Sequence, residues 1–553
     1  MTDTVVIGGG IAGLASAALL AAAGHTVTLL EKNAELGGRA GLHTEDGFTF
    51  DTGPSWYLMP EVFDHLFALL GGPNPLTLVD LDPAYRIFTA PGSRSGTGHA
   101  SEPGSAAPAA PVDVPAAPVD VPAGRERVLE LFDRLEPGSR AAVAAYLDSA
   151  SRTYRLALDH FLYTTFSTPA GFAHPEVLAG LGELTGLLST SMQDRIERTV
   201  SDPLARQILG YPAVFLGTRP ETAPAMYHLM SHLDLVDGVR YPLGGMHTLI
   251  TALAERARAL GVTIRTEAEA VSLTHHRPGR RVGGRLPGRR AQLGEVLART
   301  RHGLEVFCAE AVVAACDLHH LETRLLPRAL QTRPAASWKR ADPGMGALVL
   351  LLGVEGRLDG LAHHNLLFTA DWEQNFDAIY RDRQIPNPAS VYVCAPSRTD
   401  PRVAPAGCEN LFVLVPWPAD ASLQAHDPAV QAYADRIIEQ IAHWTGHPDL
   451  AARLRVRRVL APADFARDFH AWSGTALGPA NTLSQSIFLR GRVRSKKVGN
   501  LFYAGAFTAP GVGLPMCVIS AENVLKAFRG DRSSGPLPVP EAVAAPAAEA
   551  VVR

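Results

Sequence analysis

The sequence has 553 residues, of which 46% are hydrophobic and 19% are charged, and its formal net charge is −4 at pH 7. This length and composition predict a globular protein with two or three structural units, each large enough to bury a core. Because 51 basic residues are balanced by 55 acidic ones, the composition excludes a basic nucleic-acid-binding protein and predicts no nucleic-acid partner.

The N-terminal segment is typical of a dinucleotide-binding unit built of a strand, a glycine-rich turn, a helix and a second strand. An apolar run from Thr4 to Ile7 leads into Gly8-Gly9-Gly10-Ile11-Ala12-Gly13, and a small-residue helix follows as far as Gly24. A second apolar strand, Val27 to Leu30, ends at Glu31. A GxGxxG turn alone is weak evidence in a chain with 50 glycines. The order of the elements around it nevertheless favours a nucleotide site over a purely structural turn.

The glycines of this turn have different expected roles. Gly8 would form the tight turn, Gly10 would admit a pyrophosphate close to the backbone, and Gly13 would let the helix pack against the strand. The pyrophosphate would lie at the helix N-terminus, whose free amides favour an anion. Glu31 would accept hydrogen bonds from a ribose diol, which selects a 2′-hydroxyl over a 2′-phosphate.

The continuation Gly37-Gly38-Arg39 narrows the kind of nucleotide. With the preceding turn and Glu31, it resembles the FAD-binding signature of the flavin amine oxidase and carotenoid desaturase superfamily rather than a nicotinamide dehydrogenase. The resemblance implies that Arg39 lies near the diphosphate. There its planar guanidinium would donate charge-assisted hydrogen bonds.

The next motif is an alternating strand that ends in a Gly-Pro turn, Phe48 to Trp56 with the sequence FTFDTGPSW. Together with GGRA and a C-terminal segment described below, it resembles the bacterial phytoene desaturases of carotenoid biosynthesis. The resemblance implies that Thr52, Gly53, Pro54 and Ser55 line the flavin. An ordinary strand-ending turn is the alternative.

Residues 92–124 differ in composition from the rest of the chain. They lack aliphatic periodicity and contain a tandem duplication, in which Ala110 to Ala116 is repeated as Ala117 to Ala123. Alternating Pro, Ala and Val favours an extended chain that buries too little surface to offset its ordering entropy. We expect a disordered loop insertion here.

From Arg125 to Leu233 the pattern is helical, with apolar stripes that begin at Val128, Tyr154 and Leu181. Such stripes usually form core; alternatively, some face a long hydrophobic substrate or a bilayer, as in the helical region of the family. The segment Asp202 to Pro220 matches family segments that border substrate and flavin. Arg206 is a candidate catalytic residue only because it lies in this segment.

A second part of the flavin domain is expected at 240–325. A helix at Thr248 to Leu260 is followed by strands at Val262 to Thr266 and Val271 to Leu273, and the resemblance implies that the Val271 backbone pairs with adenine. The arginine-rich residues 277–290 are either a solvated hairpin tip or an electrostatic contact with anionic phospholipid. Glu305 to Cys316 would return the chain to the flavin domain.

Residues 345–475 predict an antiparallel sheet with helices on one face, from strand-like runs such as Ala347 to Leu352 and a helix near Val430 to Thr445. His363 and His364 alone do not make a metal site, because no third ligand stands at a useful spacing. Five scattered cysteines form no metal-ligand pattern and fit a reducing compartment. We therefore expect no metal.

The C-terminal segment from Asn500 to Glu522 is again a strand that runs into glycines and then a helix, so a second helix N-terminus can face the flavin. It resembles the desaturase motif. Gly505-Ala506 replaces the Gly-Asp of many relatives in the wider superfamily, which supports desaturases over amine oxidases. The candidate cofactor-binding residues are Gly8, Gly10, Ala12, Gly13, Glu31, Lys32, Gly38, Arg39, Thr52, Gly53, Pro54, Ser55, Val271, Gly505, Gly513, Leu514, Pro515 and Met516. No catalytic residue can be named.

The expected fold class is α/β: a discontinuous Rossmann-like FAD-binding domain of the glutathione-reductase/amine-oxidase type, with an inserted α+β substrate domain and a helical region. The flavin domain would comprise residues 1–75, 240–325 and 480–530. The helical region, the substrate domain and a disordered tail would be residues 125–235, 335–475 and 531–553.

The resemblance implies an FAD-dependent desaturase that converts 15-cis-phytoene to lycopene, with a quinone or oxygen as electron acceptor. Two alternatives remain: another polyene desaturase or a carotenoid isomerase on the same scaffold, and a non-enzymatic prenyl-binding protein that resembles the GDP dissociation inhibitors. Asp3 and the early glycines argue against a signal peptide or membrane span. We expect a cytoplasmic protein that is peripheral at the inner face of the cell membrane.

Overall fold

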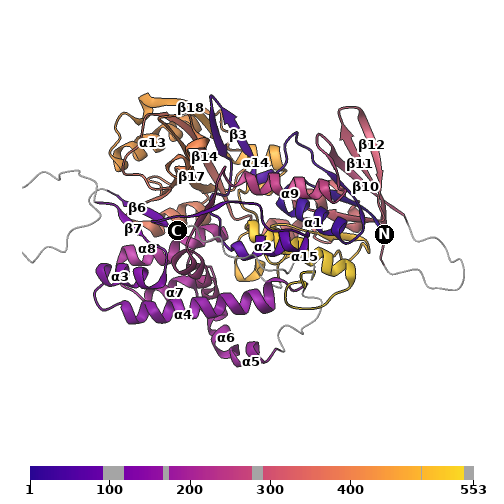
Figure 1. Cartoon of the computed structure of the whole chain (residues 1–553), viewed down its shortest axis with the longest axis horizontal. Helices are drawn as coiled ribbons and strands as arrows, with labels where there is room; N and C mark the ends of the chain where they lie inside the picture. The colour runs from indigo at the N-terminus through magenta and orange to yellow at the C-terminus, as the bar shows by residue number, and fades with distance from the viewer. Residues whose placement is uncertain (91–116, 166–173, 277–289, 487–488, 541–553) are drawn as a thin grey trace, which may run out of the picture.

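The centre of the molecule is a five-stranded parallel sheet, in a computed structural model that describes residues 1–90, 117–165, 174–276, 290–486 and 489–540 (Figure 1). The strand order is β19-β13-β1-β2-β9. The strands are β1 (Asp3–Ile7), β2 (Thr26–Leu30), β9 (Thr263–Arg265), β13 (Ala311–Ala314) and β19 (Leu501–Tyr503). They come from distant parts of the sequence, so the domain is discontinuous.

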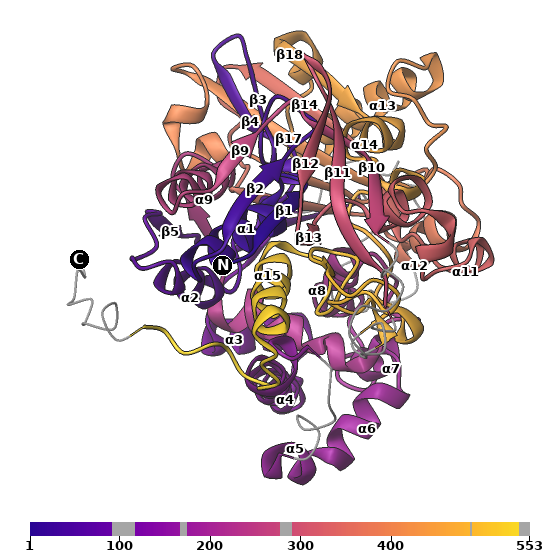
Figure 2. The same cartoon turned by 90° about the vertical axis from the view of Figure 1, so that its right-hand side faces the viewer.

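Side chains alternate across this sheet and form two different cores. Val6 packs with the helices α1 (Ile11–Ala22), α9 (His247–Ala259) and α15 (Leu514–Arg529), and Figure 2 shows α15 beside α1. Val5 and Ile7 pack instead with an antiparallel sheet of β10 (Glu269–His276), β11 (Gln292–Thr300) and β12 (Gly303–Cys308). These three layers confirm the predicted Rossmann-like α/β fold.

A seven-stranded sheet forms the second block, with the order β18-β14-β17-β16-β15-β6-β7. Even-numbered residues of β14, such as Leu348 and Leu350, pack against α13 (Pro428–Thr445), whereas Ala347 and Val349 face the opposite side. The strands are β6 (Tyr85–Thr89), β7 (Val119–Val121), β14 (Met345–Glu355), β15 (His364–Phe368), β16 (Val391–Cys394), β17 (Cys408–Pro418) and β18 (Leu454–Leu460).

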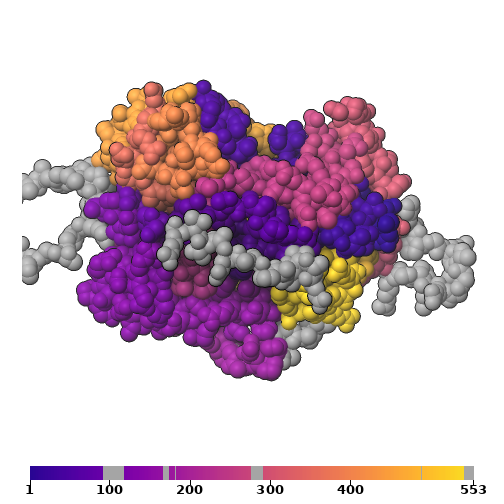
Figure 3. All heavy atoms as spheres, viewed as in Figure 1, coloured from indigo at the N-terminus to yellow at the C-terminus, as the bar shows by residue number. Residues whose placement is uncertain are grey.

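The helical region lies below both sheets in Figure 1 and forms the purple lower part of the space-filling view (Figure 3). Buried aliphatic and aromatic side chains join it to β6, β7 and β15. Its helices are α3 (Arg125–Leu135), α4 (Arg140–Ala157), α5 (Pro175–Ala179), α6 (Leu181–Ser189), α7 (Met192–Glu197) and α8 (Pro203–Gly210).

Shorter elements connect these blocks. Two further antiparallel pairs are the hairpin of β3 (Leu42–Glu45) with β4 (Phe48–Asp51) and the long-range pair of β5 (Leu78–Asp80) with β8 (Arg240–Pro242). The remaining α-helices are α2 (Pro60–Leu69), α10 (Leu318–His320), α11 (Ala335–Arg340), α12 (Trp372–Phe376) and α14 (Pro462–Phe469). Within the described residues, none of the helices combines the length and the apolar character needed to cross a membrane.

Two expectations of disorder are wrong for the residues that the structure describes. Within 92–124, Val119–Val121 forms β7 and pairs with β6, because Val121 is fully buried against the helical core. Residues 91–116 lie outside the described residues. Within the expected disordered tail, Leu537 is 5% exposed and its amide donates to Glu522 Oε1, while 541–553 are not described.

The segment Glu305 to Cys316 returns the chain to the flavin domain as expected, first in β12 of the antiparallel sheet and then in the buried strand β13, Ala311–Ala314, of the parallel sheet. The expected arginine loop falls outside the described residues apart from Arg290.

Candidate flavin and substrate site

In the glycine turn between β1 and α1, one glycine is required for close packing and another leaves space for a ligand. A Cβ at Gly13 would lie 1.9 Å from the carbonyl oxygen of Gly8, so Gly13 is required for the helix to approach the turn. A Cβ at Gly10 would have only the Gly37 oxygen within 4 Å, at 3.7 Å. Because Gly10 lines the main cavity of the molecule, its missing side chain leaves space for a ligand at the α1 N-terminus.

Glu31 lies at the carboxyl end of β2, is 5% exposed and organises the loops around it. Its Oε2 accepts a hydrogen bond of 2.6 Å from the Gly9 amide, and its Oε1 accepts one of 2.8 Å from the Asn33 amide. Burial raises the pKa of this carboxyl, while the two amide hydrogen bonds oppose the rise. Each carboxylate oxygen has further lone pairs, so Glu31 can also accept a ribose hydroxyl.

Lys32 also lines the cavity, but its Nζ donates to the carbonyls of Arg467 and Asp468 at 2.6 and 3.0 Å. These hydrogen bonds hold α14 against the nucleotide end of the cavity. The adjoining wall is formed by Ala268, Glu269 and Ala270. Val271 follows them in β10 and is not among the described residues that line the cavity.

Arg39 points a guanidinium with a free donor into the same region. Its Nε is buried and has no hydrogen-bond partner among the described residues, while its Nη2 donates weakly to the Thr475 carbonyl at 3.4 Å. Burial lowers the pKa of Arg39, and the nearby Asp317 opposes this. A buried, unpartnered guanidinium N–H beside a helix N-terminus fits a diphosphate, which would supply the missing acceptors.

The C-terminal motif completes the cradle from the opposite side. Gly513 precedes α15 with φ +108° and no side-chain cap, so the first amides of α15 remain available to a ligand. Thr52 to Ser55, Gly505 and Gly513 to Met516 all line the cavity. The structure thus brings together every predicted cofactor residue except Gly13, which packs behind the turn, and Val271.

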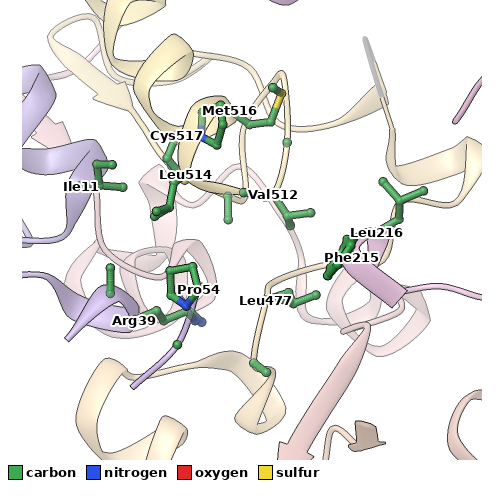
Figure 4. Close-up of a pocket in the computed structure, with 18 of the residues that line it drawn as sticks. Ile11, Arg39, Pro54, Phe215, Leu216, Leu477, Val512, Leu514, Met516 and Cys517 are labelled. Carbon is green, nitrogen blue, oxygen red and sulfur yellow. The ribbon is translucent and has the colours of Figure 1, made fainter. Parts of the chain in front are cut away.

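The cavity has a volume of ≈ 640 Å³ and continues well beyond the flavin cradle. Figure 4 shows Phe215 and Leu216 of the helical region across the cavity from Ile11, Arg39 and Pro54. One wall is the side of the seven-stranded sheet that faces away from α13. It comprises Met345, Ala347, Val349, Leu366, Phe368, Tyr392, Phe412, Leu414 and Pro416.

The other wall comes from the helical region and reaches α5 and α6. It includes Tyr154, Phe161, Leu162, Val177, Leu184, Leu188, Tyr211, Phe215, Met226, Leu229, Met230 and Leu233. Among the described lining residues that these two walls contribute, none carries a charge. The apolar stripes of the helical region therefore serve both as core and as cavity wall.

Several cavity residues were not predicted from sequence. Tyr392, whose hydroxyl is 2.6 Å from Ser55 Oγ, joins the sheet to the Gly-Pro turn. Alternation along the strands places it on this face, but only the strand order shows that the face is opposite the flavin turn. Arg206, a candidate by its segment, donates to the Val200 carbonyl and does not line the cavity.

A discontinuous Rossmann-like domain whose nucleotide cradle opens into a large apolar cavity defines a flavin-dependent oxidoreductase fold with a built-in substrate domain. The family model described as flavin containing amine oxidoreductase matches residues 11–524. Among solved structures, an oxidoreductase from Methanosarcina mazei has the same fold, with a TM-score of 0.59, 16% identity, and coverage of 95% of this chain and 100% of that chain.

Two relatives are similar over nearly their whole length. A carotenoid 3,4-desaturase from Haloarcula japonica is 37% identical over 532 residues, which cover 96% of this chain and 98% of the relative. A zeta-carotene-forming phytoene desaturase from Myxococcus xanthus is 32% identical over 527 residues, with coverage of 94% and 92%. The chain belongs to the flavin containing amine oxidoreductase family, and its cofactor is FAD.

Proposed function

We propose that this protein is an FAD-dependent carotenoid desaturase. The observation that carries the proposal is the single continuous cavity that joins the flavin cradle to a long section whose sheet and helical walls carry no charge among the described residues. A substrate of matching chemistry is a long hydrocarbon without a polar group. The two relatives, both named as desaturases of carotenoids, support the same substrate class.

The chemistry and the binding are divided between cofactor and protein. When bound, FAD supplies a hydride acceptor for an allylic C–H bond. The apolar walls bind the hydrocarbon by removing its surface from water, at roughly 25 cal/mol per Å². Aromatic residues such as Phe215, Phe368 and Phe412 orient a flat polyene and exclude water from the reacting carbon.

Two carotenoid reactions are compatible with this proposal. The sequence motifs favour stepwise conversion of 15-cis-phytoene to lycopene, with a quinone or oxygen as the final acceptor. The higher identity to a 3,4-desaturase favours a later step on an already conjugated polyene. In both reactions the enzyme removes two hydrogens from neighbouring carbons, so the same cavity serves.

The experiment is expression of the chain in two bacterial hosts, one that accumulates phytoene and one that accumulates lycopene, followed by chromatography of the pigments. New lycopene in the first host supports the phytoene reaction, and a more conjugated product in the second supports 3,4-desaturation. Val349→Trp, which fills the cavity from β14, should abolish product while the purified protein keeps its FAD absorbance. Unchanged pigments in both hosts, from protein that contains FAD, would contradict the proposal.

A lipid-soluble substrate also requires access from a membrane, and α5 is placed for this. Val177 lines the cavity, whereas the adjacent Leu178 is 54% exposed. An exposed apolar residue directly beside a cavity-lining residue favours docking on a bilayer surface. This docking, at the inner face of the cell membrane, is part of the proposal.

Liposome flotation tests the docking surface. Leu178→Glu should reduce binding to liposomes, whereas Leu304→Glu on β12, where the wild-type leucine is 64% exposed, should not. An equal loss of liposome binding in both variants would mean that binding depends on general surface hydrophobicity and not on α5. If the wild type itself remains with the soluble fraction, membrane docking is refuted.

A further inference from the structure

A second group of chemically active side chains lies next to the cavity wall, where β15 begins beside β16. His363, His364 and Cys394 are 5%, 0% and 1% exposed. One ring nitrogen of each histidine and the cysteine sulfur all lie within 4.8 Å of one another. His364 and Cys394 are direct cross-strand partners in the sheet, so both side chains point to the same face.

The hydrogen bonds of the two histidines leave the same ring atom free on each. Tyr392 OH lies 2.8 Å from His364 Nδ1, and Thr399 Oγ1 lies 2.7 Å from His363 Nδ1. Both Nε2 atoms are buried and have no hydrogen-bond partner among the described residues. When Nδ1 carries the proton and donates it to a hydroxyl oxygen, Nε2 carries the lone pair. Metal-binding histidines have this arrangement, with the second nitrogen fixed by an outer hydrogen bond.

A purely structural role accounts poorly for this cluster. Buried histidines of a core normally pair both ring nitrogens, whereas two neighbouring imidazoles here each have one buried nitrogen without a partner. The surroundings offer a place for one further small ligand. A void of ≈ 10 Å³, about the size of one water, touches Cys394 and Tyr241, and the Tyr241 hydroxyl also has no partner among the described residues.

We propose that His363, His364 and Cys394 bind one zinc ion, with a water in the adjacent void as the fourth ligand. Two imidazoles and one thiolate suit zinc, which takes mixed nitrogen and sulfur ligands in tetrahedral geometry. Ligand atoms around a tetrahedral zinc are roughly 3.5 Å apart. The three ligand atoms all lie within 4.8 Å of one another, which is compatible with this spacing after small side-chain adjustments.

The sequence did not indicate this site because the third ligand is 30 positions away and only strand pairing brings it close. The site would also act on the cavity. His364 stacks on Trp56 with ring centroids 4.5 Å apart, and its Nδ1 is hydrogen-bonded to the Tyr392 hydroxyl. Trp56 and Tyr392 both line the cavity. Zinc would thus fix the wall that lies against Ser55.

The test begins with metal analysis of the full-length protein, expressed with added zinc and purified without chelator. We expect about one zinc ion per chain. Cys394→Ser and His364→Gln should each reduce the zinc content by about tenfold or more. FAD content, measured on the same samples, reports whether each variant is folded.

A second measurement does not depend on the variants folding. Protein produced with cobalt in place of zinc should show the near-ultraviolet charge-transfer absorption of a thiolate bound to Co²⁺. His174→Gln is the matched control, because His160, His174 and Glu176 form another possible metal cluster, in which the latter two residues are exposed.

His174→Gln should leave the zinc content and the cobalt spectrum unchanged. Wild-type protein that holds no zinc above the buffer level and shows no thiolate-to-cobalt band would overturn the proposal. The same holds if Cys394→Ser retains full zinc, or if the three residues retain iron or copper instead. Because the readout is metal content and spectrum, failure of the carotenoid assay does not affect it.

Discussion

The sharpest test of the flavin site is the substitution Glu31→Gln. The carboxylate accepts one hydrogen bond at each oxygen, from the Gly9 amide at 2.6 Å and from the Asn33 amide at 2.8 Å. Glutamine keeps the shape but replaces one acceptor by an NH₂ donor, so one buried amide must lose its partner. An unsatisfied buried donor costs about 1–3 kcal/mol. Because the affected loop forms the nucleotide cradle, we expect FAD affinity to fall roughly 5- to 150-fold.

Titration of deflavinated protein with FAD, followed by flavin fluorescence, measures this change. Glu35→Gln is the matched control, because Glu35 is exposed a few residues further on and does not line the cavity. We expect the control to bind FAD within about twofold of wild type. Equal affinities for wild type and Glu31→Gln would refute the placement of the nucleotide beside β2.

Three further predictions concern stability. Burial raises the pKa of Asp234 to about 7, so its contribution to stability is greatest below its unfolded pKa of 3.8 and is lost as pH rises towards 7. As pH rises from 3.8 to 7, the free energy of unfolding of Asp234→Asn should therefore increase relative to that of wild type, by at most about 4 kcal/mol, as measured by urea unfolding. A difference between the two proteins that does not change with pH would contradict this. Lys526→Met removes the Nζ that donates to the carbonyls of Tyr163, Ser533 and Gly535, and should lower the unfolding free energy by about 3 kcal/mol, unlike Lys339→Met at an exposed site. Val121→Asp should lower the melting temperature because it places a carboxylate in the core where β7 pairs with β6, and an unchanged melting temperature would contradict the burial of this strand.

The flavin half of the site could be predicted from sequence because its geometry is local. The turn at Gly8 to Gly13, the acid at Glu31 and the turn at Thr52 to Ser55 each depend on neighbouring residues, and all of these residues except Gly9 and Gly13 contribute to the cavity lining. The need for glycine at position 13 is also local, because a Cβ there would collide with the Gly8 carbonyl of the same turn. Val271 could not be placed to within a few residues, because strand boundaries are the least certain feature of a sequence pattern.

The apolar half could not be predicted because it depends on which strands pair. The alternation along β14 and β17 is clear in the sequence, yet nothing local shows that Val349 and Phe412 face the flavin turn. The expectation of disorder at 92–124 failed for a related reason. Val119–Val121 lies in a repeat rich in proline and alanine, but its pairing with β6 and the burial of Val121 supply the stability that composition could not reveal.

The turn that carries Thr52 to Ser55 is held from both sides, which explains how a discontinuous flavin domain and a separate sheet make one site. Before the turn, Asp51 accepts hydrogen bonds from the amides of Met246 and His247 at 2.8 and 2.9 Å, at the N-terminus of α9. After it, Ser55 is bonded to Tyr392 of β16. A change in β16 therefore reaches the flavin turn through one hydrogen bond. Because β16 also carries Cys394, the proposed zinc ion and the flavin would share the same wall.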